Sequence, residues 1–228
     1  MKKFFFFIIL IIVPEYALGH ASHYKDFKKI EMEIFKDGKK IGESIYKFDH
    51  INDILTITNE TNFEVKLLGV KIFSIASNGI EVYQNDKLIS FSSSTLQNDK
   101  KKFVDLKYND QEEYYEIKGS SFSGRVSQEY IIGNWWNHKI LQSETQISPL
   151  SGSIKNQIVN FIKTEKIIVY GEEYIVKKFS LKSKEKNLNE NKKLNFFVWL
   201  EPKENLIIKV RYEKMGRWEY ILKNFERK

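Results

Sequence analysis

The sequence of 228 residues contains no cysteine, only three prolines and only four histidines. The lack of cysteine excludes disulfide bridges, thiolate zinc sites and an N-terminus acylated on cysteine. Arginine is also scarce, because nearly all of the 37 basic residues are lysines. Phosphate and base recognition usually favours the planar fork of arginine, so we do not expect this protein to bind nucleic acid.

The N-terminus has the pattern of an export signal. Lys2 and Lys3 precede an unbroken apolar run, Phe4–Val13, and small residues follow as far as Gly19. The run is too short for a membrane span, which needs about 20 apolar residues. We therefore predict a cleaved signal peptide over residues 1–19, and no membrane span in the rest of the chain. Cleavage after Ala21 and retention of the segment as an uncleaved anchor are the alternatives.

Residues 20–228 are predicted to form a single all-β domain. Apolar and polar residues alternate in many segments, among them 30–34 and 206–212, as in strands with one buried face. Turn signals separate these segments at hairpin spacing, which predicts antiparallel neighbours. The resulting meander should curl into an open barrel or a sandwich-like sheet, with at most one or two short helices. The predicted turns are Asp37–Gly38, Asn78–Gly79, Asn85–Asp86, Asn109–Asp110, Gly171, Glu201–Pro202 and Gly216.

Three segments depart from this alternation. Gln128–Ile140 contains a compact Gly-Asn-Trp-Trp-Asn-His cluster and predicts a short helix or a folded loop. Residues 182–193 are polar and charged, which predicts a mobile loop between two strands. The strand Asn195–Leu200 is apolar on both faces, so we expect it inside the curled sheet or beneath another segment.

The sequence offers little for catalysis. Ser92–Thr95 is rich in hydroxyls but lacks the motifs of serine nucleophiles, and adjacent carboxylates such as Glu112 and Glu113 diverge on a strand or turn. Of the histidines, only His138 lies in a segment that could form a structured pocket. We therefore predict no catalytic residue, no metal site and no cofactor. A hydrolase that combines Ser, Asp or Glu with His138 is an alternative.

Aromatic residues make up 14% of the chain and include four tryptophans. They can form an ordinary core, because large β domains fill a sheet face with such residues. They can also line a cavity for an apolar or amphipathic ligand, which a curled sheet is able to enclose. In the second case we predict Trp135, Trp136, Trp199 and Trp218 as ligand-binding residues, with Asn137 and His138 as polar groups that orient the ligand.

Several elements resemble, in order, those of a known family. Phe35–Gly42 is similar to the opening hairpin of exported bacterial proteins in domain-of-unknown-function family 6134. The resemblance extends over about Tyr24–Leu222, and it implies an exported, mostly antiparallel β domain that is periplasmic in a bacterium with two membranes. The domain that this resemblance implies is similar in outline to envelope proteins whose curled sheet holds lipophilic molecules. Further matching elements are Leu68–Val70, Glu81–Tyr83, Leu88–Ser93 and Asn134–Asn137.

These observations favour a non-enzymatic envelope protein that binds a lipophilic or amphipathic ligand on a curled sheet. An alternative is an interaction or assembly module of the cell envelope, which would use exposed strand edges or the Trp135–Trp136 loop. The formal charge of +7 favours a weak attraction to anionic membrane surfaces.

Overall fold

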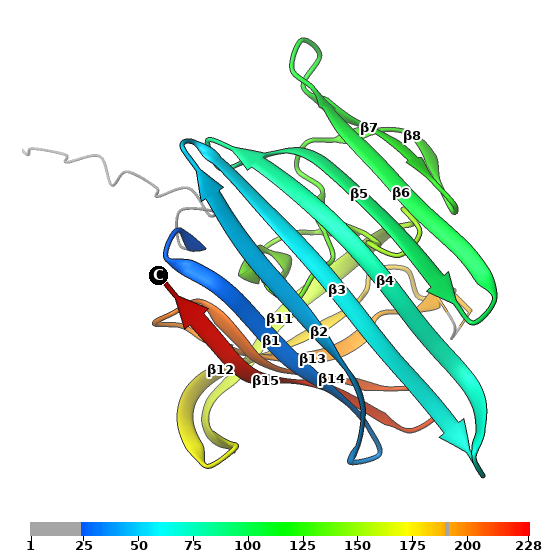
Figure 1. The fold of residues 1–228 in the computed structure, drawn as a ribbon, viewed down its shortest axis with the longest axis vertical. Helices are drawn as coiled ribbons and strands as arrows, with labels where there is room; N and C mark the ends of the chain where they lie inside the picture. Colours follow the sequence, from blue (N-terminus) through cyan, green and yellow to red (C-terminus); the bar gives the residue numbers. More distant parts are fainter. Residues whose placement is uncertain (1–23, 190–191) are drawn as a thin grey trace, which may run out of the picture.

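The structure is a computed structural model that describes residues 24–189 and 192–228. The predicted export signal, residues 1–19, lies outside the described residues, as do His20 and His23. Fifteen strands form one sheet, and a short 3₁₀ helix, η2, lies between β9 and β10 (Figure 1). The elements are β1 (Phe27–Lys36), β2 (Lys39–Ile51), β3 (Ile54–Leu67), β4 (Val70–Gln84), β5 (Lys87–Gln97), β6 (Lys100–Asn109), β7 (Tyr114–Gly119), β8 (Ser123–Ser127), β9 (Ile131–Ile132), η2 (His138–Leu141), β10 (Thr145–Ile147), β11 (Ile154–Val169), β12 (Glu172–Ser183), β13 (Asn195–Glu201), β14 (Leu206–Glu213) and β15 (Arg217–Arg227).

The sheet is a meander whose first and last strands pair with each other. Its order runs from β8 back to β1, then from β15 back to β9. Neighbouring strands are antiparallel, except that β9 and β10 are parallel. The two outermost strands, β8 and β9, do not pair, so the sheet is not closed into a barrel. The predicted all-β class and open, curled sheet are therefore confirmed.

The sheet curls so that its two halves face each other across one core (Figure 1). Strands β2–β6 supply buried side chains such as Phe91 and Leu106 from one half, and β13–β14 supply Val198 and Val210 from the other. Alternation explains this arrangement, because every second residue of each strand points inward. Among the described residues, no helix has the length and apolarity needed to cross a bilayer.

The structure separates correct turn predictions from an incorrect one. Asp37 and Gly38 have φ values of 50° and 80° and connect β1 to β2, as predicted. The predicted turn at Asn78–Gly79 is wrong, because both residues lie inside β4, where Gly79 faces Asn59 on β3. Alternation of buried and exposed residues continues through Gly79, so the sheet register overrides the local turn signal.

The remaining segments agree with their predicted environments. The cluster within Gln128–Ile140 contains the start of η2, as expected of a short helix or folded loop. The polar stretch predicted as a loop connects β12 to β13, although residues 182 and 183 still belong to β12. Both faces of β13 are covered, since Trp199 on its outer face is only 6% exposed and donates a hydrogen bond to Glu165 of β11.

Candidate functional site

The segment Gly133–Leu141, which we call the plug, lies between the two halves of the sheet. Its central side chain is Trp136, which is only 2% exposed. The Trp136 ring packs edge-on against Tyr24, Phe48 and Tyr83, with ring centroids 5.0, 5.6 and 5.9 Å away. Aromatic pairs in this arrangement stabilise a core beyond the burial of their area. Trp136 therefore belongs to the core of the fold.

A buried carboxylate on β4 fixes the plug to the sheet. Oε1 of Glu81 accepts hydrogen bonds from Nδ2 of Asn134 at 2.5 Å and from Nε1 of Trp136 at 2.8 Å. Oε2 accepts a third from the hydroxyl of Tyr83 at 2.7 Å. All three donors are neutral. Burial raises the pKa of Glu81, while these hydrogen bonds act in the opposite direction.

Asn137 and His138 orient the end of the plug. The side-chain oxygen of Asn137 accepts from the backbone N–H of Lys139 at 3.0 Å and so caps η2. His138 is 4% exposed, and its Nδ1 lies 2.9 Å from the hydroxyl of Tyr24. That hydroxyl also donates to the carbonyl of Asn205 at 3.1 Å. These contacts join the start of the described chain to the plug.

Next to the plug, the inner face of four adjacent strands carries a row of hydroxyl groups. Ser44 of β2, Thr61 of β3, Ser77 of β4 and Thr95 of β5 lie directly opposite one another in the register. Their oxygens are 2.7 Å apart in the Ser44–Thr61 pair and 2.7 Å apart in the Ser77–Thr95 pair. We call this row the hydroxyl ladder. Asn59, two residues before Thr61 on the same face of β3, donates from Nδ2 to the Ser44 hydroxyl at 3.1 Å and extends the polar surface.

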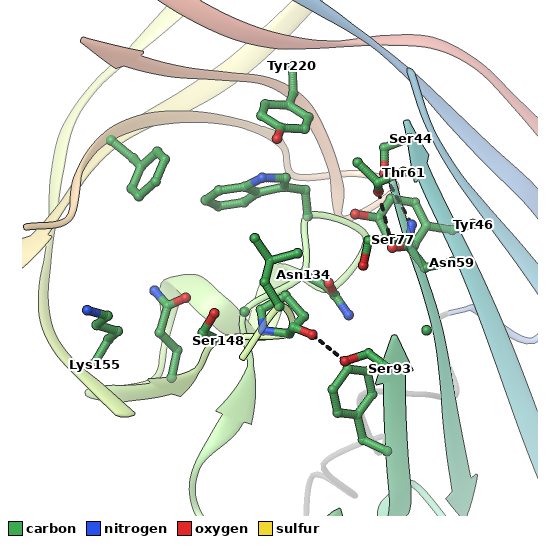
Figure 2. Close-up of a pocket in the computed structure, with 18 of the residues that line it drawn as sticks. Ser44, Tyr46, Asn59, Thr61, Ser77, Ser93, Asn134, Ser148, Lys155 and Tyr220 are labelled. Atoms are coloured by element: carbon green, nitrogen blue, oxygen red, sulfur yellow. Dashed lines mark hydrogen bonds between the residues drawn. The ribbon is translucent and has the colours of Figure 1, made fainter. Parts of the chain in front are cut away.

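Ser44, Thr61 and Ser77 of the hydroxyl ladder line one wall of a cavity of about 220 Å³, which we call the ladder pocket. The facing wall is aromatic. There Trp135 lies 5.1 Å from Phe196 and 6.3 Å from Tyr220, measured between ring centroids. Figure 2 shows Ser44, Thr61 and Asn59 at the right of this space, Tyr220 at its top and Lys155 at its left. The pocket therefore offers hydrogen-bonding groups on one side and aromatic surface on the other.

The polar groups of the ladder pocket are mostly uncharged. Burial raises the pKa of Tyr46 to about 12, so its phenol stays neutral at physiological pH. Lys155 is the one charged residue among those that line the pocket. Burial, with a smaller effect from Lys192, lowers the pKa of Lys155, whose Nζ donates to the carbonyl of Lys192 at 3.2 Å. The pocket suits a neutral polar group or one with a single weak negative charge.

The six predicted ligand-binding residues do not share one cavity. Trp135 lines the ladder pocket, whereas Trp136, Asn137 and His138 lie in the plug, and Asn137 also borders a second cavity of about 690 Å³. Trp199 borders a third cavity, of about 300 Å³, on the outer face. Trp218 packs against Phe63 and Phe73 with centroids 5.8 and 6.2 Å away.

Two parts of this arrangement escaped the sequence analysis. Glu81 was considered only as part of a family element, and the hydroxyl ladder is dispersed over four strands. A signal for Glu81 does exist, because Ser77, Gly79, Glu81 and Tyr83 occupy alternate inward positions of β4. A glutamate in the inward phase of such a strand predicts a buried carboxylate. Within residues 24–189 and 192–228, no three His, Asp or Glu gather as a metal site would require.

Comparisons with known proteins fit this fold. The chain matches the model of Domain of unknown function (DUF6134) over residues 32–223 and belongs to that family. Among curated proteins, none matches the chain. A β-barrel-like protein of Domain of Unknown Function DUF1849 from Brucella abortus has the same fold, with a TM-score of 0.61 and 8% identity over 89% of this chain and 98% of that one.

A second solved structure overlaps less well. It is a protein from Bacteroides fragilis NCTC 9343, described as a candidate exported protein with a YmcC-like fold. Its TM-score is 0.37 and its identity 11%, over 88% of this chain and 99% of that one. An overlap at this score does not support an argument about fold or function.

Proposed function

We propose that this member of the DUF6134 family is a non-enzymatic exported protein that holds a small amphipathic ligand in the ladder pocket. The observation that carries the proposal is the contrast between the two walls of the pocket. Hydroxyl and amide groups such as Ser93 and Asn59 suit a polar edge, while Trp135 and Phe196 suit an apolar face. Binding sites commonly combine apolar burial with a few polar groups that fix orientation.

The size of the pocket narrows the class of ligand. At about 220 Å³ it is smaller than the roughly 300–1,000 Å³ typical of sites that enclose a drug-sized molecule. The plug already occupies the space between the two halves of the sheet, so a large lipophile spread over the inner face does not fit this arrangement. A single ring, or the head of a longer amphiphile, matches the available volume.

The chemistry of the lining supports binding over catalysis. The hydroxyls of Ser44 and Thr61 hydrogen-bond to each other, and Ser93 donates to the carbonyl of Pro149 at 2.6 Å. A serine nucleophile would need a neighbouring base within hydrogen-bond reach instead. His138 lies in the plug with its Nδ1 beside Tyr24. Export is supported by the charged and apolar pattern of residues 1–19. Residence in the periplasm is supported by the resemblance to the family alone.

Native mass spectrometry tests the proposal directly. The protein is produced by export, purified without detergent, and weighed before and after denaturation. We expect extra mass in the native spectrum that disappears on denaturation and is recovered in an organic extract. An apo mass from several expression hosts would contradict the proposal.

A pair of variants assigns any bound mass to the pocket. Trp135→Ala removes the aromatic wall and should lower the fraction of protein that carries the extra mass. Trp218→Ala serves as the matched control, because Trp218 is also half-buried but lies outside the ladder pocket. Equal loss of bound mass in both variants would place the ligand elsewhere.

A second candidate function is a protein-interaction module, and the free edge of β11 favours it. Strand β10 pairs with β11 only over Ile154–Asn156, so the remainder of this long strand pairs with β12 alone. Phe161 and Ile168 on this stretch are 57% and 71% exposed. Unpaired edges of this kind accept an added strand.

Pull-down from envelope extract tests this second function. A specific partner should be recovered with the wild type and lost with Phe161→Lys.

A further inference from the structure

One hairpin extends past both of its neighbours in the sheet. Strand β2 pairs with β3 only as far as Phe63, and β5 pairs with β4 only as far as Ile75. Asn98, in the turn after β5, still donates a backbone hydrogen bond to the carbonyl of Ser74 at 3.0 Å. Past Ser74, the strand pairing of β3 and β4 in the described chain is only with each other. All residues from 66 to 72, at the tip, are exposed. We call this tip the finger, and it projects at the lower right of Figure 1.

The finger is apolar where hairpin turns are normally polar. Its side chains Leu67, Leu68, Val70 and Ile72 are 61%, 97%, 66% and 52% exposed. Leu68 also has a φ of 50°, in the left-handed region that a bulky residue rarely adopts. Asn or Gly at this turn position would avoid both the strain and the exposure. The sequence therefore keeps an unfavourable leucine at the most exposed point of the hairpin.

Positive charge surrounds these apolar side chains. Lys66 and Lys71 lie directly opposite each other, and like charges in this position repel. Glu64 offsets one of them, with its Oε1 2.9 Å from Nζ of Lys66. Lys100 and Lys101, both exposed, begin β6, which is separated from the finger by β5, at the same end of the sheet. An anionic surface would relieve the repulsion between the two opposed lysines.

We propose that the finger docks on an anionic membrane surface. Leu67, Leu68 and Val70 enter the apolar boundary of the bilayer, while Lys66 and Lys71 keep their charged ends at the level of the lipid phosphates. The charge around the finger favours lipid phosphate over an apolar groove on a protein. This surface is separate from the ladder pocket, and the inference goes beyond ligand binding by giving the protein a position at the membrane.

Vesicle binding tests the inference. The protein is produced by export, and its intact mass is measured to establish that the apolar run Phe4–Val13 is absent from the sample. Binding to vesicles of phosphatidylcholine mixed with phosphatidylglycerol is compared with binding to phosphatidylcholine alone. We expect the wild type to bind the anionic vesicles more tightly and to be released by added salt, because salt screens the lysine–phosphate attraction.

The decisive variant is Leu67→Ser combined with Leu68→Asn. Its affinity for anionic vesicles should be at least about tenfold lower than that of the wild type, because two leucine side chains no longer enter the bilayer. The same variant should fold at least as well as the wild type, since Asn accepts a positive φ more readily than Leu. Circular dichroism and thermal unfolding check this, so that weaker binding is not confused with unfolding.

Ile51→Ser is the matched control. Ile51 is 62% exposed, nearly the same as Leu67, and also borders a two-residue turn, Asn52–Asp53. That turn lies at the opposite end of β2 and β3, and the charged residues next to Ile51 there are the acidic Asp49 and Asp53. Its substitution should leave vesicle binding unchanged. Equal binding by the wild type and the finger variant would overturn the inference. So would a native dimer that is lost in the finger variant, with no vesicle binding by the wild type.

Discussion

Trp135 and Trp136 are neighbours in the sequence and lie in unlike surroundings. Trp136 is 2% exposed and contacts three aromatic rings and the buried carboxylate of Glu81. Trp135 is half-buried and lines the ladder pocket, where it contacts Phe196 and Tyr220. The space around Trp136 is therefore filled by the chain itself, whereas the space beside Trp135 is left open at the ladder pocket. Aromatic content alone therefore does not distinguish a packed core from the lining of a pocket.

The largest effect on stability should come from removing the buried ring of Trp136. Trp136→Ala leaves a large cavity and three aromatic neighbours without their packing partner, so we expect a loss of about 3–5 kcal/mol in the free energy of unfolding. Trp135→Ala should cost less than half as much, because its ring already borders open space. Urea unfolding of both variants measures the difference. Equal losses in the two variants would contradict the distinction between the packed surroundings of Trp136 and the open surroundings of Trp135.

The next largest effect concerns the carboxylate that holds the plug. Glu81→Ala leaves three buried donors, on Tyr83, Asn134 and Trp136, without their acceptor. We expect a loss of about 2–4 kcal/mol, again from urea unfolding. Glu81→Gln is the control, because its amide keeps the shape and retains an acceptor oxygen for Asn134 and Trp136. A Gln variant as unstable as the Ala variant would show that the charge itself, and not the hydrogen bonding, holds the plug.

The pH dependence of stability gives a second test of the role of Glu81. Burial raises the pKa of Glu81 in the folded state above its ordinary value of 4.5. Between that value and the higher pKa of the folded state, the unfolded chain releases the Glu81 proton more readily than the folded chain does. The contribution of Glu81 to the free energy of unfolding therefore falls as the pH rises through this range. The stability of Glu81→Gln relative to the wild type should therefore increase over this range. The two unfolding free energies, measured in parallel from acidic to neutral pH, check the sign, and a constant difference would contradict it.

The smallest expected effect on stability concerns the hydroxyl ladder beside the ladder pocket. Ser77→Ala removes one hydroxyl of the ladder and leaves Thr95, also buried, without its partner at 2.7 Å. We expect a loss of about 1 kcal/mol in the free energy of unfolding. Replacing both residues, with Ser77→Ala and Thr95→Val, should restore part of that loss because no buried hydroxyl remains unpaired. A larger loss in the double variant would show that the ladder stabilises the sheet through more than this one hydrogen bond.

Much of the fold was predictable because it depends on local alternation. The strands around Ile30 and Leu206, the turn at Asp37–Gly38 and the irregular cluster before η2 all follow from residues close together in the chain. The turn predicted at Asn78–Gly79 failed because the same dipeptide serves a strand when its neighbours fix the register. The candidate site was less predictable, since its polar wall is built from single residues on four strands.

The all-β class of this protein follows from residues that are close together in the chain: alternating strands bury one face, and hairpins place neighbouring strands side by side. Strand periodicity and turn chemistry are local properties, so they can be read without knowing the partners. The positions of the two tryptophans follow instead from the three-dimensional packing, which buries Trp136 in the core and leaves Trp135 at a pocket. These positions depend on segments far apart in the chain. Glu81 hydrogen-bonds to the plug, and residues of the hydroxyl ladder, β13 and β15 line one pocket.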